Sequence, residues 1–155
     1  NGCSAWRYCI NIARTYEFMS IEKKIQYYKD SLDFFDETME KYKFLLDQGK
    51  KSQTFPEEYR KDTFKVEGCQ AQVWLVPYLK DHLIYFHSDS DAFISKGMIT
   101  ILCDIFSGNT PKEISKINIE LLDALNLNVL LTPGRRNGVH AMLLKIQEHA
   151  KSHLE

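Results

Sequence analysis

The sequence predicts an α+β fold in a single domain, with a small antiparallel β-sheet (a hairpin plus a short strand) packed against several helices. The 155 residues are 44% hydrophobic, which is ordinary for one globular domain and sufficient for a core. Apolar residues recur at helical spacing toward both ends of the chain, whereas β-branched and aromatic residues cluster in its middle. Helices and strands are therefore segregated along the chain, as is typical of α+β folds.

Two helices are predicted before the sheet. Ser20 can cap a helix over 21–35, in which apolar residues share one face: Ile21, Ile25, Tyr28 and Leu32. A second helix is predicted over 39–49, and it is expected to stop at Gly49, because glycine readily adopts the left-handed conformation that ends many helices. Residues 1–19 have no clean period and are expected to form an extension packed on the body or a frayed end.

The predicted sheet is built around a hairpin. Residues 73–76 are β-branched and aromatic, which favours a strand. Pro77 has no N–H to donate, so it places this strand at a sheet edge or at a bend. Residues 80–82 predict a turn, and 83–86 predict the partner strand. The brief alternation at 64–66 predicts a short strand.

A strongly apolar helix is predicted over 92–106, closed by Gly108. Its apolar residues cover more than one face, which indicates the central buried helix of the fold. Asp89, Ser90 and Asp91 come just before it, and we interpret their side-chain oxygens as N-caps.

The remaining chain predicts short helices and one long one. Thr110-Pro111-Lys112-Glu113 has the pattern of a capping box with proline at the first helical position. Asn118 can cap another short helix that ends at Leu125. The last helix is predicted to begin at Thr132-Pro133 or at Asn137, and its inner stripe is apolar: Val139, Met142, Leu143 and Ile146.

Charge and hydropathy exclude two classes of partner. The formal net charge is -1, and nucleic-acid binding requires a strongly basic surface. No apolar run approaches the roughly 20 residues that span a bilayer. We therefore expect neither nucleic acid nor membrane as a partner.

The four cysteines have different surroundings. Cys3 and Cys9 match no metal or redox spacing and are interpreted as incidental thiols. Cys103 lies among apolar residues of the predicted central helix and is expected in the core. Cys69 follows Gly68 in a loop between strand-like segments, where a thiol is accessible to another molecule. From these residues alone, a reactive Cys69 and an inert one are equally supported.

Arg135 and Arg136 stand where positive charge is unfavourable, at the start of the last helix. Two interpretations are equally supported: an anionic neighbour such as a thiolate or carboxylate, or a solvated loop pair. The five histidines have no ligand spacing, so no metal site is predicted.

Four segments, in order, resemble the SufE family of sulfur-acceptor proteins of iron–sulfur cluster assembly. They are VEGCQAQVW at 66–74, SDSDA at 88–92, ISKG at 94–97 and LTPGRRNG at 131–138. The resemblance covers about residues 42–148. Ala71 and Ser88 depart from the residues common in the family, but neither replaces the thiol.

The resemblance implies that Cys69 takes sulfur from the persulfide of a SufS-like cysteine desulfurase, stimulates that enzyme and passes sulfur to an iron–sulfur scaffold complex. Gly68, Gln70 and Arg135 are then expected to support the Cys69 loop, and Asp89 and Asp91 to contact the partner. Pyridoxal phosphate is expected on the desulfurase and no cofactor on this chain, which would act as an accessory protein more than a stand-alone enzyme, as a monomer or weak dimer.

Two other functions stay open at this point: a cysteine-nucleophile hydrolase and a non-catalytic helical adaptor with structural thiols. The resemblance divides the chain into an N-terminal extension with the first helix (1–30) and a sulfur-acceptor domain (31–155). The chain begins with Asn1, and its amino-acid composition is typical of an AT-rich genome. We therefore expect a processed protein of a plastid- or apicoplast-like stroma, with the cytoplasm as the alternative.

Overall fold

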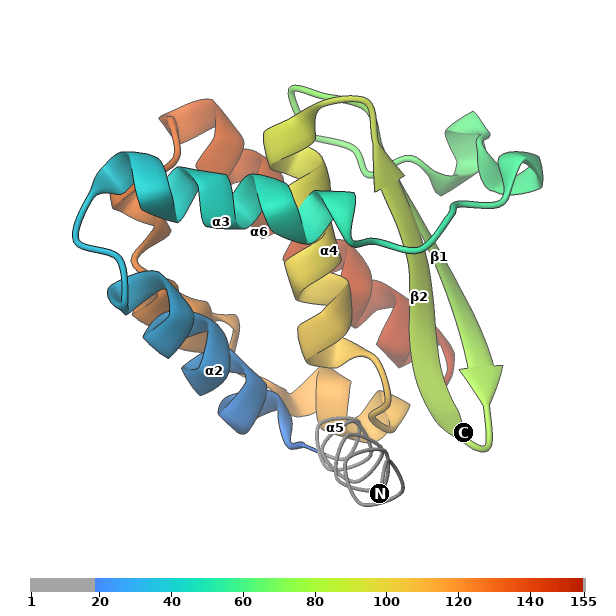
Figure 1. Cartoon of the computed structure of the whole chain (residues 1–155). Coiled ribbons are helices and arrows are strands. Elements are labelled where there is room, and N and C mark those ends of the chain that lie inside the picture. Colours follow the sequence, from blue (N-terminus) through green and yellow to red (C-terminus); the bar gives the residue numbers. More distant parts are fainter. Residues whose placement is uncertain (1–18, 155) are drawn as a thin grey trace, which may run out of the picture.

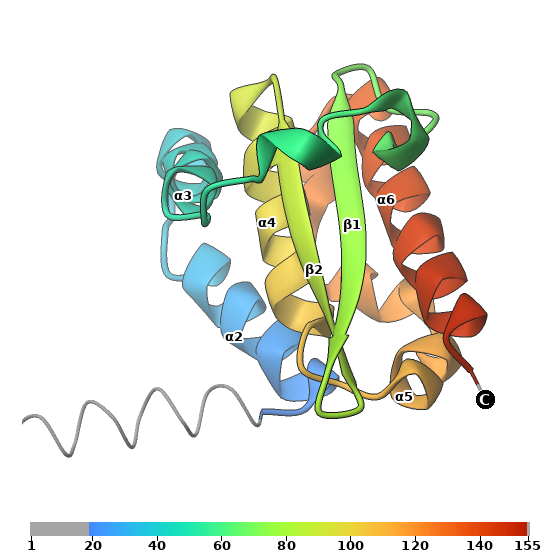
Figure 2. The same cartoon turned by 90° about the vertical axis from the view of Figure 1, so that its right-hand side faces the viewer.

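The computed structural model describes residues 19–154 and has the predicted α+β fold, with a main hydrophobic core and a smaller buried cluster of Phe55, Trp74 and Val76. Helix α4 (Phe93–Phe106) runs through the centre, with α2 (Ile21–Asp33) and α3 (Thr38–Lys50) on one side and the hairpin on the other (Figure 1). Helix α6 (Pro133–Ser152) packs behind α4, and Figure 2 shows it running beside the hairpin. Short elements complete the chain: η1 (Glu57–Tyr59), η2 (Asp62–Phe64), α5 (Pro111–Lys116), η3 (Ile119–Leu125) and η4 (Leu127–Val129).

The two helices before the sheet lie close to their predicted ranges. The Ser20 side chain accepts from the backbone N–H of Lys23, which confirms this residue as the N-cap of α2. The predicted apolar face of α2 is buried in the common core: Ile21, Ile25, Tyr28 and Leu32. Helix α2 continues across residue 30, where the chain was predicted to divide into an extension and a domain. That division stays a prediction.

Gly49 does not end its helix, which corrects the prediction for that residue. It lies inside α3 and is buried against α4, where a Cβ built on it would come 2.9 Å from the backbone nitrogen of Gly97. A Cβ on Gly97 would come 2.1 Å from the carbonyl oxygen of Leu45. The two glycines therefore allow α3 and α4 to cross with their backbones in contact. Neither glycine has a positive φ.

The hairpin consists of β1 (Val73–Lys80) and β2 (Leu83–Ser90), both longer than predicted. Asp81 and His82 join them, with φ of 54° and 66°, which is the geometry of a type I′ turn. The Ile84 N–H donates to the carbonyl of Asn109, so the backbone groups of Ile84 face away from β1. Backbone groups two residues apart on a strand face the same way, so those of Phe86 also face away from β1. Pro77 pairs with Phe86. The missing N–H therefore costs no bond in the ladder, as expected for an edge position.

The expected short strand at 64–66 is only a single bridge, in which Lys65 pairs with Trp74. The proposed N-caps at 89–91 are also wrong, because β2 continues through Ser90 and the N-cap position of α4 is Ala92, which makes no side-chain cap bond. Strand pairing extends to Val73 and Ser90, so this segment is used by the sheet before the helix begins.

The C-terminal elements follow the predicted pattern. Thr110 and Glu113 form the complete capping box of α5, and Asn118 caps η3, which is a 3₁₀ helix. Thr132 caps α6 with Pro133 at its first position, so the alternative start at Asn137 is wrong.

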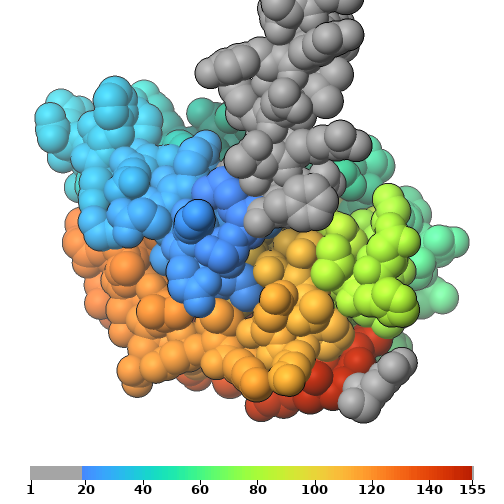
Figure 3. Space-filling view, turned by 90° about the horizontal axis from the view of Figure 1, so that it is seen from below, coloured from blue at the N-terminus to red at the C-terminus, as the bar shows by residue number. Residues whose placement is uncertain are grey.

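The start of α2, the hairpin turn and α5 meet on the face shown in Figure 3. In residues 19–154 no helix is both long and apolar enough to cross a membrane.

Candidate functional site

Cys69 lies in the loop that joins η2 to β1, as predicted, and its thiol is free. Gly68 has a φ of +94°, a conformation that side chains other than glycine rarely adopt. This turn carries the chain onto α6, where a Cβ on Gly68 would lie 3.3 Å from the Cβ of Ala141. The glycine before the cysteine therefore lets the loop reach its seat on the helix.

Small residues on one face of α6 form that seat. Gly134, Gly138 and Ala141 are spaced four and three apart, which places them along one side of the helix. Gly138 lies under Cys69, with 3.6 Å between its ideal Cβ position and the sulfur, and Gly134 lies under the Gln70 amide. Sequence reasoning missed this face, although the spacing of the small residues was a visible signal.

The Cys69 thiol is half-buried in a small cavity between the loop, α4 and α6. Its Sγ lies 3.6 Å from the carbonyl oxygen of Gly138 and can donate a weak hydrogen bond to it. Burial raises the pKa of Cys69, and the charge of Arg135 opposes that shift. The free space is about 10 Å³, close to what one water molecule needs. At rest, the structure thus favours a protonated, sheltered thiol.

Arg135 lines the same cavity, and its role in supporting the Cys69 loop stays a prediction. Its backbone N–H donates to the Thr132 cap, and its guanidinium Nη1 donates to the hydroxyl of Ser95 on α4. The partner of the Arg135 guanidinium is thus a neutral hydroxyl, and the thiol in the same cavity is protonated at rest, so the expected anionic neighbour of the arginine pair is not found among the residues that line the cavity. Arg136 instead points toward η4, where Nη1 lies 3.4 Å from the carbonyl oxygen of Asn128. Ser95 is a cavity residue that sequence reasoning did not identify.

Asp89 and Asp91 have different surroundings. The Asp89 side chain is only 13% exposed and pairs with Arg60 at 2.8 Å and with Lys96 at 3.5 Å. The Arg60 guanidinium in turn lies over the Trp74 ring, 4.8 Å from its centroid. Asp89 therefore ties the η1 segment and α4 to the end of β2.

Asp91, by contrast, is exposed. Its carboxylate accepts from the backbone N–H and the side-chain amide of Gln72, three residues after the thiol, at 2.9 and 3.0 Å. The hydrogen bond from the Gln72 side chain lowers the pKa of Asp91. Of the two predicted partner-binding carboxylates, Asp91 is the one available at the surface, next to the base of the Cys69 loop.

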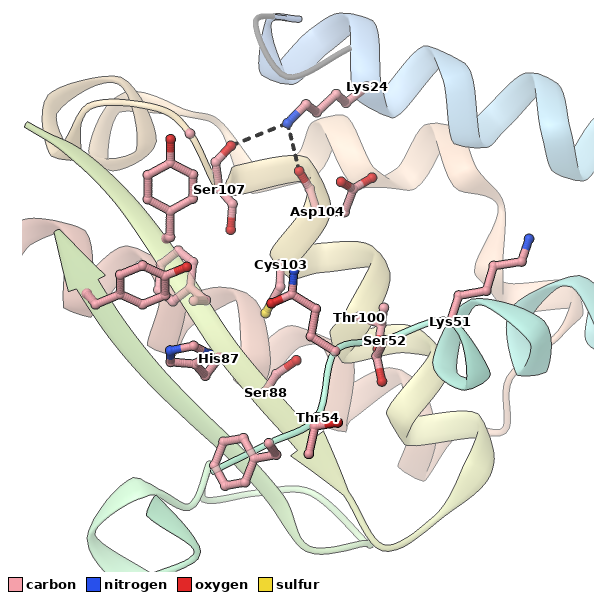
Figure 4. Close-up of a pocket in the computed structure, with 16 residues that line it drawn as sticks. Lys24, Lys51, Ser52, Thr54, His87, Ser88, Thr100, Cys103, Asp104 and Ser107 are labelled. Atoms are coloured by element: carbon pink, nitrogen blue, oxygen red, sulfur yellow. Dashed lines mark hydrogen bonds between the residues drawn. The ribbon is translucent and has the colours of Figure 1, made fainter. Parts of the chain in front are cut away.

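A second, wider cleft lies between the segment after α3, strand β2 and α4, and has a volume of about 520 Å³ (Figure 4). Cys103 lies on its floor and is buried, which confirms the expected core position. Burial raises the pKa of Cys103 to about 12, so the thiolate is almost absent at neutral pH. Thiol chemistry is therefore confined, among the described cysteines, to Cys69; Cys3 and Cys9 lie outside the described residues.

Other chemistries find little support near Cys69. No histidine is among the residues that line its cavity, so the pairing that a cysteine hydrolase needs is missing there. Within residues 19–154, no group of three or more histidine, cysteine or acidic side chains could hold a metal ion.

Replacing Gly134 with alanine is expected to loosen the loop without unfolding the protein. The new Cβ would lie 2.1 Å from the Gln70 amide nitrogen, the mobile end of a side chain, so Gln70 must leave its seat. We expect iodoacetamide to alkylate Cys69 about two- to fivefold faster, because exposure controls thiol reactivity. Peptide-resolved mass spectrometry measures the rate, with the buried Cys103 as internal control. An unchanged rate would mean that the Gln70 contact does not hold the loop.

The chain is similar in sequence to a known protein family and to proteins named after it. The family model SufE, described as the Fe–S metabolism associated domain, matches residues 26–150. An uncharacterised SufE-like protein of Rhizobium meliloti is 34% identical over 130 residues, covering 81% of this chain and 93% of the relative. A SufE-like protein of Synechocystis sp., also uncharacterised, is 36% identical over 110 residues, covering 71% of this chain and 69% of the relative.

The solution structure of a hypothetical protein from Thermus thermophilus has the same fold. Its TM-score is 0.69 at 17% identity, and the match covers 83% of this chain and 94% of that one. At that identity the likeness concerns the fold alone. The family match covers most of the chain, including the Cys69 loop, its seat on α6 and the start of α4, so this chain belongs to the SufE family.

Proposed function

We propose that this protein accepts sulfur from the persulfide of a cysteine desulfurase onto Cys69 and carries it toward iron–sulfur cluster assembly. The observation that carries the proposal is a free thiol on a glycine-turned loop, half-buried in a cavity beside Arg135. The family's association with Fe–S metabolism supports the same conclusion. Pyridoxal phosphate would belong to the desulfurase, and a scaffold complex would receive the sulfur.

The transfer is an exchange between sulfur atoms with no net oxidation. The Cys69 thiolate attacks the outer sulfur of the desulfurase persulfide along the S–S axis. A new S–S bond forms at Cys69 while the donor's S–S bond breaks. The donor cysteine leaves as a thiolate and takes up the proton that Cys69 released. Clearing its cysteine in this way lets the desulfurase begin another cycle.

Attack along that axis requires the Cys69 loop to leave its cavity. The contacts that hold it at rest are modest, because the thiol makes one weak hydrogen bond and the loop lies on small residues of α6. Once the sulfur is out of the cavity, burial no longer raises the pKa of Cys69, and the thiolate becomes accessible. Docking would therefore couple exposure of the sulfur to its activation.

The direct test is sulfur mapping. The protein is incubated with a pyridoxal-phosphate cysteine desulfurase and cysteine, and its intact mass and peptides are then measured. We expect a gain of one sulfur atom on the Cys69 peptide, reversed by dithiothreitol, and none on the Cys103 peptide. A protein that gains no sulfur, or gains it elsewhere, contradicts the proposal. Hydrolysis of thioester or peptide substrates that is lost with Cys69 would support the hydrolase instead.

The two carboxylates should respond differently to charge reversal. Asp91→Lys alters an exposed group and is expected to change the Kd for the desulfurase about three- to tenfold, with little change in stability. Asp89→Lys puts a third cation beside Arg60 and Lys96 and should lower the unfolding free energy by about 2 kcal/mol or more. Titration calorimetry and urea unfolding measure the two effects. If Asp91→Lys changes only stability, its carboxylate is a clamp for Gln72 and not a partner contact.

A further inference from the structure

Ser95 is one of few buried polar residues in the described part of the chain. Its residue exposure is 5%, and it lies in the first turn of α4 between the apolar residues Ile94 and Met98, which line the Cys69 cavity with it. A hydroxyl at such a position requires a hydrogen-bond partner, because an unpaired buried polar group is costly. The partner is the guanidinium of Arg135, whose Nη1 donates to the Ser95 oxygen.

Arg135 depends on the same bond for its position. Its backbone N–H is held by Thr132, but Ser95 provides the only side-chain partner of its guanidinium within residues 19–154. An arginine side chain has large rotational freedom, and one bond to a rigid, buried helix position removes much of it. The bond thus joins the start of α6 to the start of α4 across the cavity that holds the thiol.

The cavity contains no competing charge. Among the residues that line it, Arg135 and Cys69 are the only charged or titratable ones. All the other residues of the lining are neutral. In a partly buried site, one cation near one sulfur is weakly screened. Small changes in the position of the guanidinium therefore change the strength of its electrostatic interaction with the sulfur.

We propose that Ser95 is a positioning residue, whose hydroxyl holds Arg135 against the Cys69 cavity so that its charge stabilises negative charge on the sulfur. The same charge would favour the anionic outer sulfur once a persulfide has formed, and this second part rests on the proposed function. The first part concerns the free protein and does not require any sulfur transfer.

A matched pair of variants isolates the hydroxyl. Ser95→Thr and Ser95→Val differ by a hydroxyl in place of a methyl group, so they have nearly equal volume and similar helix propensity. The rate of Cys69 alkylation by iodoacetamide is measured against pH on the free protein, resolved by peptide so that the other thiols do not contribute. Ser95→Val is expected to move the midpoint to higher pH and to slow alkylation below the midpoint about three- to tenfold. Ser95→Thr should restore the wild-type profile.

A purely structural role for Ser95 gives a different result. A loosened cavity exposes Cys69 and speeds alkylation at every pH, including the plateau, without raising the midpoint; that result would overturn the proposal, as would identical profiles for the two variants. In an Arg135→Gln background, Ser95→Val should have no further effect, because there is no longer a charge to position. A Ser95→Val effect of the same size in that background would also contradict the proposal.

The positioning role of Ser95 and the sulfur-carrier function can fail independently. Urea unfolding of each variant checks that the fold is intact, and if Ser95→Val does not fold, Ser95→Ala is compared with Ser95→Thr in the same way. If the wild-type protein accepts no sulfur but the alkylation profiles behave as expected, the carrier function fails and the positioning role stands. If sulfur is accepted while the two profiles coincide, the positioning role fails alone.

Discussion

Cys69→Ser is expected to lose sulfur acceptance completely while keeping the wild-type fold. A serine oxygen cannot form the S–S bond that holds the transferred sulfur, and it is a far weaker nucleophile at neutral pH. The residue lies in a loop, and the hydrogen bond of its sulfur to the Gly138 carbonyl is weak, so the exchange of one atom should change stability by less than about 1 kcal/mol. Intact-mass measurement after incubation with a desulfurase and cysteine should show no added sulfur.

The matched control is Cys103→Ser. This substitution removes the other described thiol. Because Cys103 is buried, the new hydroxyl would lie in the core, and we expect a loss of stability. It should nevertheless accept sulfur as well as the wild type. If Cys69→Ser still gains sulfur on Cys3, Cys9 or Cys103, the carrier role belongs to another cysteine. If the wild-type protein and both variants accept none, the carrier role fails and the adaptor with structural thiols is supported instead.

Local signals carried most of the fold prediction. Ser20, Thr110 and Thr132 each bond backbone groups within three residues, so a short stretch of sequence contains both partners of the interaction. Helical spacing of apolar residues predicts burial for the same reason, because one face of a helix is defined by its own chain. These elements could be located without knowing what they pack against.

Residues whose role depends on distant partners were not predictable in this way. Gly49 resembles a helix terminator in isolation, but Gly97, far along the chain, requires it to be small. In the sequence, Asp89 and Asp91 resemble helix caps or a surface pair. In the structure, Asp89 pairs with Arg60 and Lys96, and Asp91 accepts from Gln72. The pairing of β2 with β1 decides where the strand ends and the helix begins, and a local pattern does not contain that information.

The candidate site shows the same division. The Gly68-Cys69 loop and the unfavourable position of the Arg135 charge at a helix start were visible in the sequence. That Arg135 lies near the loop was expected from the resemblance to a family. Ser95 gave no signal, because a serine in the first turn of a helix is common on the surface. Its role depends on the packing of α4 against α6, which buries the hydroxyl and gives it a single partner.

Gly97→Ala is expected to be the most damaging single-methyl substitution at the helix crossing. The new Cβ would lie 2.1 Å from the Leu45 carbonyl oxygen and 2.9 Å from its carbon, and both atoms belong to the backbone of α3. Removing that overlap requires α3 to move away from α4, which opens the core around Leu45 and Met98, both nearly inaccessible to solvent. The helix propensity gained by replacing glycine, about 1 kcal/mol, offsets only part of this.

We expect the free energy of unfolding to fall by about 3 kcal/mol or more for Gly97→Ala, measured by urea denaturation. Gly134→Ala provides the matched control, because it adds the same methyl group to a helical glycine at an equal distance from its nearest neighbour. That neighbour is the movable end of Gln70 and not a backbone atom, so its stability should change by less than about 1 kcal/mol. Equal stabilities for the two variants would mean that α3 can shift freely on α4. A large loss confined to Gly97→Ala means that the helix crossing, which fixes where α4 presents Ser95 to the thiol cavity, is set by the absence of one side chain.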